Sequence, residues 1–138
     1  MASTGICLII VMDVIVMFKK LPDAEFEVMK TVWDTTAPMS VNAVAAQMDK
    51  DWKIQTLISL MHRLVERKFI RTEKNGNERV YYPIIEREEY LKFETGNFVK
   101  QYHENSFMNL VTTLYDNKGL SNDDIDELLK WAKDRRAD

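Results

Sequence analysis

The stretch that decides the fold of this chain runs from Trp52 to Pro83 and reads WKIQTLISLMHRLVERKFIRTEKNGNERVYYP. Its first half places apolar residues at helical spacing, and its second half holds an Asn75-Gly76 pair between two candidate strands. An Asn-Gly pair supplies the positive φ angles that a tight hairpin turn requires. An amphipathic helix that leads directly into a hairpin predicts a winged helix, and the commonest use of that fold is to read DNA.

The predicted helix, residues 53–67, has one apolar and one polar face. Apolar residues recur at positions i, i+3, i+4 and i+7 and form its inner face, which consists of Leu57, Leu60, Met61 and Leu64. The outer face carries small polar and basic groups. The residues expected at base edges are Gln55, Thr56, Ser59 and His62, and those expected at phosphates are Lys53, Arg63 and, on the hairpin, Lys74 and Arg79. A solvated helix face would have a similar composition, and that alternative stays open.

Two shorter helices are expected before this segment. The first begins at Pro22-Asp23, ends before Pro38 and carries an apolar stripe of Phe26, Met29, Val32 and Trp33. The second follows a Ser40 cap, and its inner face consists of Val41, Val44, Ala45 and Met48. Three helices and a hairpin complete a winged-helix domain, which we place at residues 21–84.

Residues 85–138 show helical patterns alone, so the predicted fold class is mostly α with a small β-hairpin. Helices this short and one-sided do not easily bury a core, so we expect them to form a dimerisation region with a second copy of the chain. The alternative is that they fold back onto their own N-terminal domain. The residues expected at the dimer interface are Phe107, Leu110, Val111, Leu114, Ile125, Leu128 and Leu129. The last two helices are predicted to have N-terminal caps. The first of them is capped by Ser106, and the second by Ser121 together with Asp124.

Charge is unevenly distributed along the chain. The whole chain has a net charge of −3, whereas the segment from Lys50 to Arg79 has a net charge of +4 and the tail from Asp116 to Asp138 one of −2. A basic middle between acidic flanks fits one surface that faces nucleic acid on an otherwise acidic protein. The same charge distribution would equally be expected of an ordinary solvated helix and hairpin that bind no nucleic acid.

Motifs that carry chemistry are scarce. Cys7 is the single cysteine, so the chain can form no intrachain disulfide and no cysteine-based zinc site. The two histidines, His62 and His103, lack ligand spacing, and we find no nucleophile–base pair or Gly-rich phosphate loop. We therefore expect no enzymatic activity, no cofactor, no metal, no small-molecule ligand, and a reducing, cytoplasmic location.

Residues 1–20 form an apolar extension in front of the predicted domain. The apolar run over residues 6–18, broken by Asp13, is shorter than the roughly 18 to 20 residues that a membrane helix needs. No basic region precedes it, as a signal peptide would require. The simpler interpretation is an upstream start codon, with Met12 or Met17 as the true start, or an extension introduced by cloning. The alternative is an added strand or helix that packs on the domain or on a partner.

Three groups of residues carry a family resemblance. The opening segment from Leu21 to Trp33 reads LPDAEFEVMKTVW, and the late segment from Leu120 to Leu128 reads LSNDDIDEL. Between them, the matching positions are Trp52, Thr56, Leu57, Arg63, Leu64, Lys68-Phe69 and Tyr81-Tyr82-Pro83. Together these segments resemble the penicillinase and methicillin-resistance repressors in one register, over roughly residues 21–134.

That resemblance implies a dimeric transcriptional repressor with an N-terminal winged helix and a C-terminal helical dimerisation region. It implies a palindromic operator in double-stranded DNA and control of resistance or stress genes. It also implies a membrane sensor-protease pathway that triggers cleavage of the repressor and frees the operator. The family's cleavage bond aligns with Thr113-Leu114 in this chain.

The chain departs from the family pattern at functionally important places. The family's Lys and Arg at the start of the recognition helix are Gln55 and Ile58 here, so we expect a different operator. Gln can read adenine, whereas Ile offers apolar contact alone. Thr113-Leu114 replaces the family's Asn-Phe bond, which leaves cleavage open, and the tail has no Cys-x-Cys pair for copper sensing. The alternative functions are a winged-helix protein-interaction module and a regulator that answers a different signal.

Overall fold

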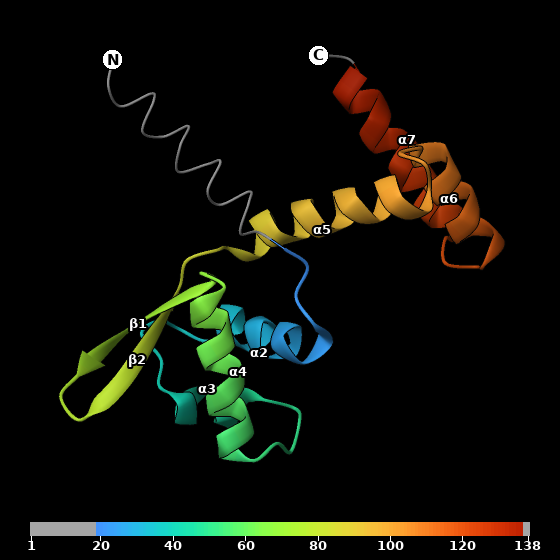
Figure 1. The fold of residues 1–138 in the computed structure, drawn as a ribbon. Coiled ribbons are helices and arrows are strands. Elements are labelled where there is room, and N and C mark those ends of the chain that lie inside the picture. Colours follow the sequence, from blue (N-terminus) through green and yellow to red (C-terminus); the bar gives the residue numbers. More distant parts are fainter. Residues whose placement is uncertain (1–18, 137–138) are drawn as a thin grey trace, which may run out of the picture. The chain divides into compact units, whose positions relative to one another are not determined.

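The computed structural model describes residues 19–136, so the predicted N-terminal extension lies, apart from Lys19 and Lys20, outside the described residues. The chain divides into two compact units, one ending at Lys92 and one starting at Phe93. The predicted fold class, a mostly helical chain with a winged helix and one β-hairpin, is confirmed (Figure 1). Within residues 19–136, none of the helices is both long and apolar enough to span a bilayer.

The first unit contains three helices followed by a hairpin. The helices are α2 (Asp23–Asp34), α3 (Val41–Gln47) and α4 (Ile54–Glu66), and the strands are β1 (Ile70–Asn75) and β2 (Glu78–Pro83). Helix α4 is one residue shorter at each end than predicted. Helices α2 and α3 both pack against α4, which places α4 at the centre of the unit (Figure 1).

The inner face of α4 is the apolar face that the sequence predicts. Leu57, Leu60, Met61 and Leu64 are all buried. Each fully buried side chain of this size contributes roughly 1.5–3 kcal/mol of transfer free energy. Burial of this face leaves the opposite face of α4 to the solvent.

The buried stripe of α2 differs from the predicted one. Met29 and Val32 are buried as expected, but Phe26 and Trp33 are only half-buried. The remaining buried positions of α2 are Glu25 and Val28, so the stripe follows residues 25, 28, 29 and 32. In α3, Val44 is the one buried residue. The Ser40 cap of α3 forms as predicted, and the Ser40 hydroxyl accepts a hydrogen bond from the Ala43 N–H at 3.1 Å.

The hairpin turn needs one positive φ angle rather than two. The strands pair antiparallel with Asn75 opposite Glu78, so Asn75 is still an extended strand residue. Gly76 alone in the turn has a positive φ, +70°. A positive φ at the first central residue only is the arrangement of a type II′ turn, which favours Gly at that place.

Met39, before α3, joins β2 through two hydrogen bonds with Tyr81, of 2.8 and 3.2 Å.

Helix α5 (Arg87–Tyr102) begins inside the first unit. Tyr90 is buried there, and its hydroxyl accepts a hydrogen bond from the Leu21 N–H at 2.9 Å. Its ring lies 5.7 Å from the ring of Phe26, 5.9 Å from that of Trp33 and 5.6 Å from that of Phe69. The sequence grouped Tyr90 with the later helices, whereas its side chain completes the winged-helix core.

The second unit consists of the rest of α5, then α6 (Phe107–Asp116) and α7 (Asn122–Arg136). Both predicted caps are present. The Ser106 hydroxyl accepts from the Asn109 N–H at 3.1 Å, and Ser121 and Asp124 exchange hydrogen bonds of 2.9 and 3.1 Å. Hydrogen bonds to Ser121, the backbone N–H first, hold the pKa of the exposed Asp124 carboxyl below its ordinary value. No side chain of α6 or α7 is buried in the described part of the chain.

Candidate nucleic-acid interface

The outer face of α4 presents every residue of the helix that the sequence assigned to DNA. All of these side chains are exposed, and they are Lys53, Gln55, Thr56, Ser59, His62 and Arg63. They share one face because the apolar positions on the opposite face hold the helix against α2 and α3. The exposed face therefore has the donors, acceptors and cations that a DNA-reading helix uses.

The start of α4 is open to an anion. Lys53 occupies the N-cap position without a side-chain cap hydrogen bond, and the first turn holds no acidic residue. Each of the other five described helices has an acidic first turn or a capping serine. The first N–H groups of a helix carry partial positive charge, so a lysine there is unfavourable in isolation and favourable beside a phosphate. This end of α4 is therefore suited to a polyanion.

His62 has a competing partner on its own helix. Its Nε2 atom lies 3.1 Å from the Oε1 atom of Glu66, and both side chains are largely exposed. An exposed pair four residues apart contributes only a few tenths of a kcal/mol, roughly 0.3–0.5. A base or phosphate can therefore displace Glu66 at little cost, and His62 stays a candidate contact.

Two cations face each other across the wing. Lys74 lies directly opposite Arg79 in the β1–β2 ladder, and both are exposed. Like charges at directly opposite positions destabilise a hairpin. Neither side chain forms an ion pair with a carboxylate in the part of the chain that the structure describes. The arrangement is unfavourable for the free protein and suits a phosphate group placed between the two cations.

A third cation of the wing, Arg71, already contacts an aromatic ring and a carboxylate of the same hairpin. Arg71 stacks on the Tyr82 ring, with its guanidinium carbon 3.9 Å from the ring centroid, and pairs with Glu73 at 3.2 Å. The Tyr82 hydroxyl donates to the other carboxylate oxygen of Glu73 at 3.0 Å, and this hydrogen bond raises the pKa of Tyr82 above its ordinary value. Arg71 therefore stabilises the wing, whereas Lys74 and Arg79 have no carboxylate partner in the described chain.

One buried charge was missed by the sequence analysis. Glu25 is 1% exposed, and its Oε2 atom lies 3.0 Å from Nε of Arg67, at the end of α4. The contact is an ion pair without hydrogen-bond geometry, and neither carboxylate oxygen accepts a hydrogen bond from another described residue. The signal was present, because Glu25 falls in register with Val28, Met29 and Val32. Arg67, which contributes to the basic middle of the sequence, thus links α4 to α2.

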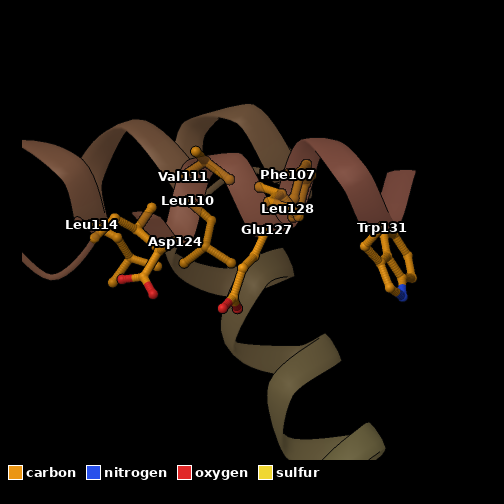
Figure 2. A pocket seen from close by; sticks show the side chains of 9 residues that line it. Phe107, Leu110, Val111, Leu114, Asp124, Glu127, Leu128 and Trp131 are labelled. Atoms are coloured by element: carbon orange, nitrogen blue, oxygen red, sulfur yellow. The ribbon is translucent and has the colours of Figure 1, made fainter. Parts of the chain in front are cut away.

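The second unit exposes an apolar groove of about 550 Å³ (Figure 2). Of the residues predicted at a dimer interface, Phe107, Leu110, Val111, Leu114 and Leu128 line this groove, whereas Ile125 and Leu129 do not. Leu120 and Trp131, which were not among the predicted interface residues, line it as well. Trp131, three residues after Leu128, is 56% exposed. Asp124 and Glu127 supply the acidic groups of the lining.

The bond aligned with the family's cleavage site lies inside α6. The Thr113 carbonyl accepts a hydrogen bond from the Asn117 N–H at 3.1 Å, and the Leu114 carbonyl accepts one from the Gly119 N–H at 2.7 Å. A helical bond of this kind has to unwind before it fits an extended protease site. Both Thr113 and Leu114 are exposed, so the surface around the bond is accessible.

The sequence is similar to known repressors over most of its length. The family model described as "Penicillinase repressor" matches residues 21–134. The "Penicillinase repressor" of Bacillus licheniformis is 27% identical over 123 residues, covering 86% of this chain and 95% of the relative. The "Methicillin resistance regulatory protein MecI" of Staphylococcus aureus is 32% identical over 111 residues, covering 79% of this chain and 89% of the relative. The resemblance inferred from the motifs is thereby confirmed.

Proposed function

Because the chain belongs to the penicillinase repressor family, we propose that it represses transcription by binding operator DNA through α4 and the β1–β2 wing. In this proposal Gln55, Thr56, Ser59 and His62 meet base edges. The cations Lys53, Arg63, Lys74 and Arg79 meet phosphates. The relatives' names support resistance genes as the regulated genes.

The observation that carries this proposal is the set of unpaired cations on the exposed face of α4 and on the wing. Lys53 and Arg63 on the helix and Lys74 and Arg79 on the wing lack carboxylate partners in the described chain. The lysine at the helix start and the facing pair on the wing each reduce the stability of the free protein slightly. Both become favourable when phosphate oxygens approach, and phosphate contacts supply much of the affinity for DNA. A protein-interaction module would not require this pattern of unpaired positive charge.

Dimerisation belongs to the same proposal. The apolar groove of α6 and α7 supports pairing with a second copy, because an exposed apolar surface of this kind favours association. Two-fold symmetry of the dimer would require a palindromic operator. Its half-sites would lie about one helical turn apart, roughly 34–36 Å, or a multiple of that distance.

Release of the operator is proposed to follow disruption of this dimer interface. Cleavage at Thr113-Leu114, triggered by a membrane sensor-protease pathway, would remove α7 and six of the nine residues that line the groove. The position of the bond in exposed α6 supports access after local unwinding. A signal of another kind that opens the same groove would have the same effect.

A mobility-shift assay with the promoter of the chain's own operon tests the central part of the proposal. We expect the full chain to shift this duplex in the presence of excess random-sequence DNA. A control duplex of the same length and composition but shuffled sequence should stay free. Equal shifts of both duplexes, or no shift of either, would contradict a repressor with a specific operator.

A further inference from the structure

Two isoleucines form an apolar edge on the otherwise polar outer face of α4. Ile54 is 41% exposed and Ile58 is 42% exposed, and they are the large apolar side chains of α4 that are exposed. A spacing of four residues places them next to each other on the helix surface. The next position along this edge, again four residues on, is His62. The edge therefore runs beside the proposed base-reading groups Gln55 and Ser59.

Exposure of these residues is not sufficient evidence for a function, because single exposed apolar side chains are common. Their surroundings are more informative. They occupy the first half of α4, and the N-terminal residues of a recognition helix are those that contact base edges. Lys53, at the start of α4, gives this part of the helix a positive charge and has no carboxylate partner in the described chain.

A positively charged surface with an apolar edge matches one feature of the DNA major groove. The base edges there present hydrogen-bond donors and acceptors and a single apolar group, the C5-methyl of thymine. Phosphates flank that methyl group and complement the cations of α4. A protein partner with an acidic rim is the competing occupant, and the experiment below separates the two.

Building on the proposed DNA-binding function, we propose that Ile58 reads a thymine in each operator half-site through contact with its C5-methyl group. Ile54 extends the same apolar edge along the groove. Gln55, on the neighbouring face, supplies the hydrogen bonds that a methyl contact lacks. Ile58 is thus a specificity-determining residue that selects thymine over cytosine at one position.

The size of the effect follows from the area that one methyl group buries. Removing one buried methyl group from an apolar contact weakens binding by about fourfold. Replacing thymine with deoxyuracil removes only this group and keeps the Watson–Crick pair. The substitution therefore isolates the methyl contact from every hydrogen bond in the interface.

The experiment starts with selection of duplexes from a random double-stranded library by the full-length chain. Each thymine of the selected half-site is then replaced in turn with deoxyuracil, and affinity is measured by fluorescence anisotropy. For the unaltered protein we expect one position per half-site at which the replacement weakens binding about fourfold. For Ile58→Ala we expect weaker binding to the thymine duplex and no further loss with deoxyuracil.

Ile84→Ala is the matched control. Ile84 is 44% exposed, like Ile58, but lies after the wing and outside α4. This variant should keep the full methyl dependence. Far-UV circular dichroism of both variants checks that the exposed substitutions leave the fold intact.

The failures of the two proposals are distinguishable. Two outcomes would contradict the proposed methyl contact and leave the repressor function intact. In the first, the chain selects a specific duplex but no deoxyuracil position weakens binding. In the second, the methyl effect persists in Ile58→Ala. Unchanged DNA affinity of Ile58→Ala would also overturn the inference and would assign the apolar edge to another partner. If the chain selects no duplex at all, both proposals are wrong.

Discussion

At the scale of single residues, the ion pair between Glu25 and Arg67 links α2 to α4. The Glu25 carboxylate is buried, while 37% of the Arg67 side chain stays exposed. A buried carboxylate without its partner retains its desolvation penalty, whereas water screens the exposed side of the pair. The pair is therefore a structural contact, and we do not count Arg67 among the proposed DNA-binding cations.

We predict that Arg67→Ala lowers the free energy of unfolding by about 1–3 kcal/mol, a range reduced from that of fully buried pairs because of the exposure of Arg67. Urea unfolding followed by circular dichroism measures this change. The matched control is Lys30→Ala, which breaks the exposed pair with Glu27 (Nζ–Oε1, 3.3 Å) and should change stability by less than about 0.5 kcal/mol. Equal effects of the two substitutions would show that the Glu25 carboxylate does not depend on Arg67.

At the scale of elements, the wing has one cation that is held by contacts within the hairpin and two cations without carboxylate partners in the described chain. Arg71 is held by Tyr82 and Glu73, whereas Lys74 and Arg79 face each other. Relief of like-charge repulsion should stabilise the free hairpin, and removal of a phosphate-binding cation should weaken the complex. The wing therefore offers a test in which folding stability and DNA affinity move in opposite directions.

We predict that Arg79→Thr raises the free energy of unfolding of the unbound protein by a few tenths of a kcal/mol, about 0.2–0.5. The same variant should bind promoter DNA more weakly. Arg71→Thr is the control elsewhere on the wing, and it should lower stability because it removes the contacts with Glu73 and Tyr82. Thermal unfolding without DNA and anisotropy with DNA give the two quantities. An Arg79→Thr protein that is less stable, or binds as tightly as before, would contradict this role of the wing.

The sequence predicted those elements whose signals are local. The inner face of α4 repeats at regular helical spacing, and Gly76 marks the turn, so helix and hairpin were both found. The caps at Ser40, Ser106 and Ser121 were predicted for the same reason, since each hydroxyl accepts a hydrogen bond from an N–H group only three residues later in the chain.

Contacts between distant segments were not predictable from such local signals. Tyr90 joins the core through Leu21, which is 69 positions away in sequence. The helical register of Glu25 indicates burial, but its partner Arg67, from the far end of α4, follows from the three-dimensional structure alone. The exposed face of α4 was predicted correctly, but which cations stay unpaired depends on contacts such as that between Arg71 and Glu73.

At the scale of the whole molecule, the proposed dimer forms when a second copy covers the groove of α6 and α7. Within this unit, Phe107, Leu114 and Trp131 are between 40% and 57% exposed. Tryptophan is among the residue types that most often contribute strongly to the affinity of an interface. Trp131 therefore offers a direct test of the proposed dimer.

We predict that Trp131→Ala weakens the dimer on the order of 30-fold, which corresponds to the roughly 2 kcal/mol typical of an aromatic hot spot. Sedimentation equilibrium of the full chain measures the dissociation constant. Met108→Ala is the control, because Met108 is 64% exposed on α6 but does not line the groove. A Trp131→Ala protein with an unchanged dissociation constant would place the dimer interface elsewhere.

The outer face of α4 is proposed to bind DNA through its cations, and the salt dependence of promoter affinity for Arg63→Ala is the sharpest test of this role. Anisotropy titrations over a range of NaCl concentrations give the slope of log K against log salt, which reports the number of phosphates that the protein neutralises. We predict weaker binding to every duplex and a slope shallower by about 0.9 for each phosphate that Arg63 neutralises. The same slope and affinity for Arg63→Ala and the unaltered protein would contradict the claim.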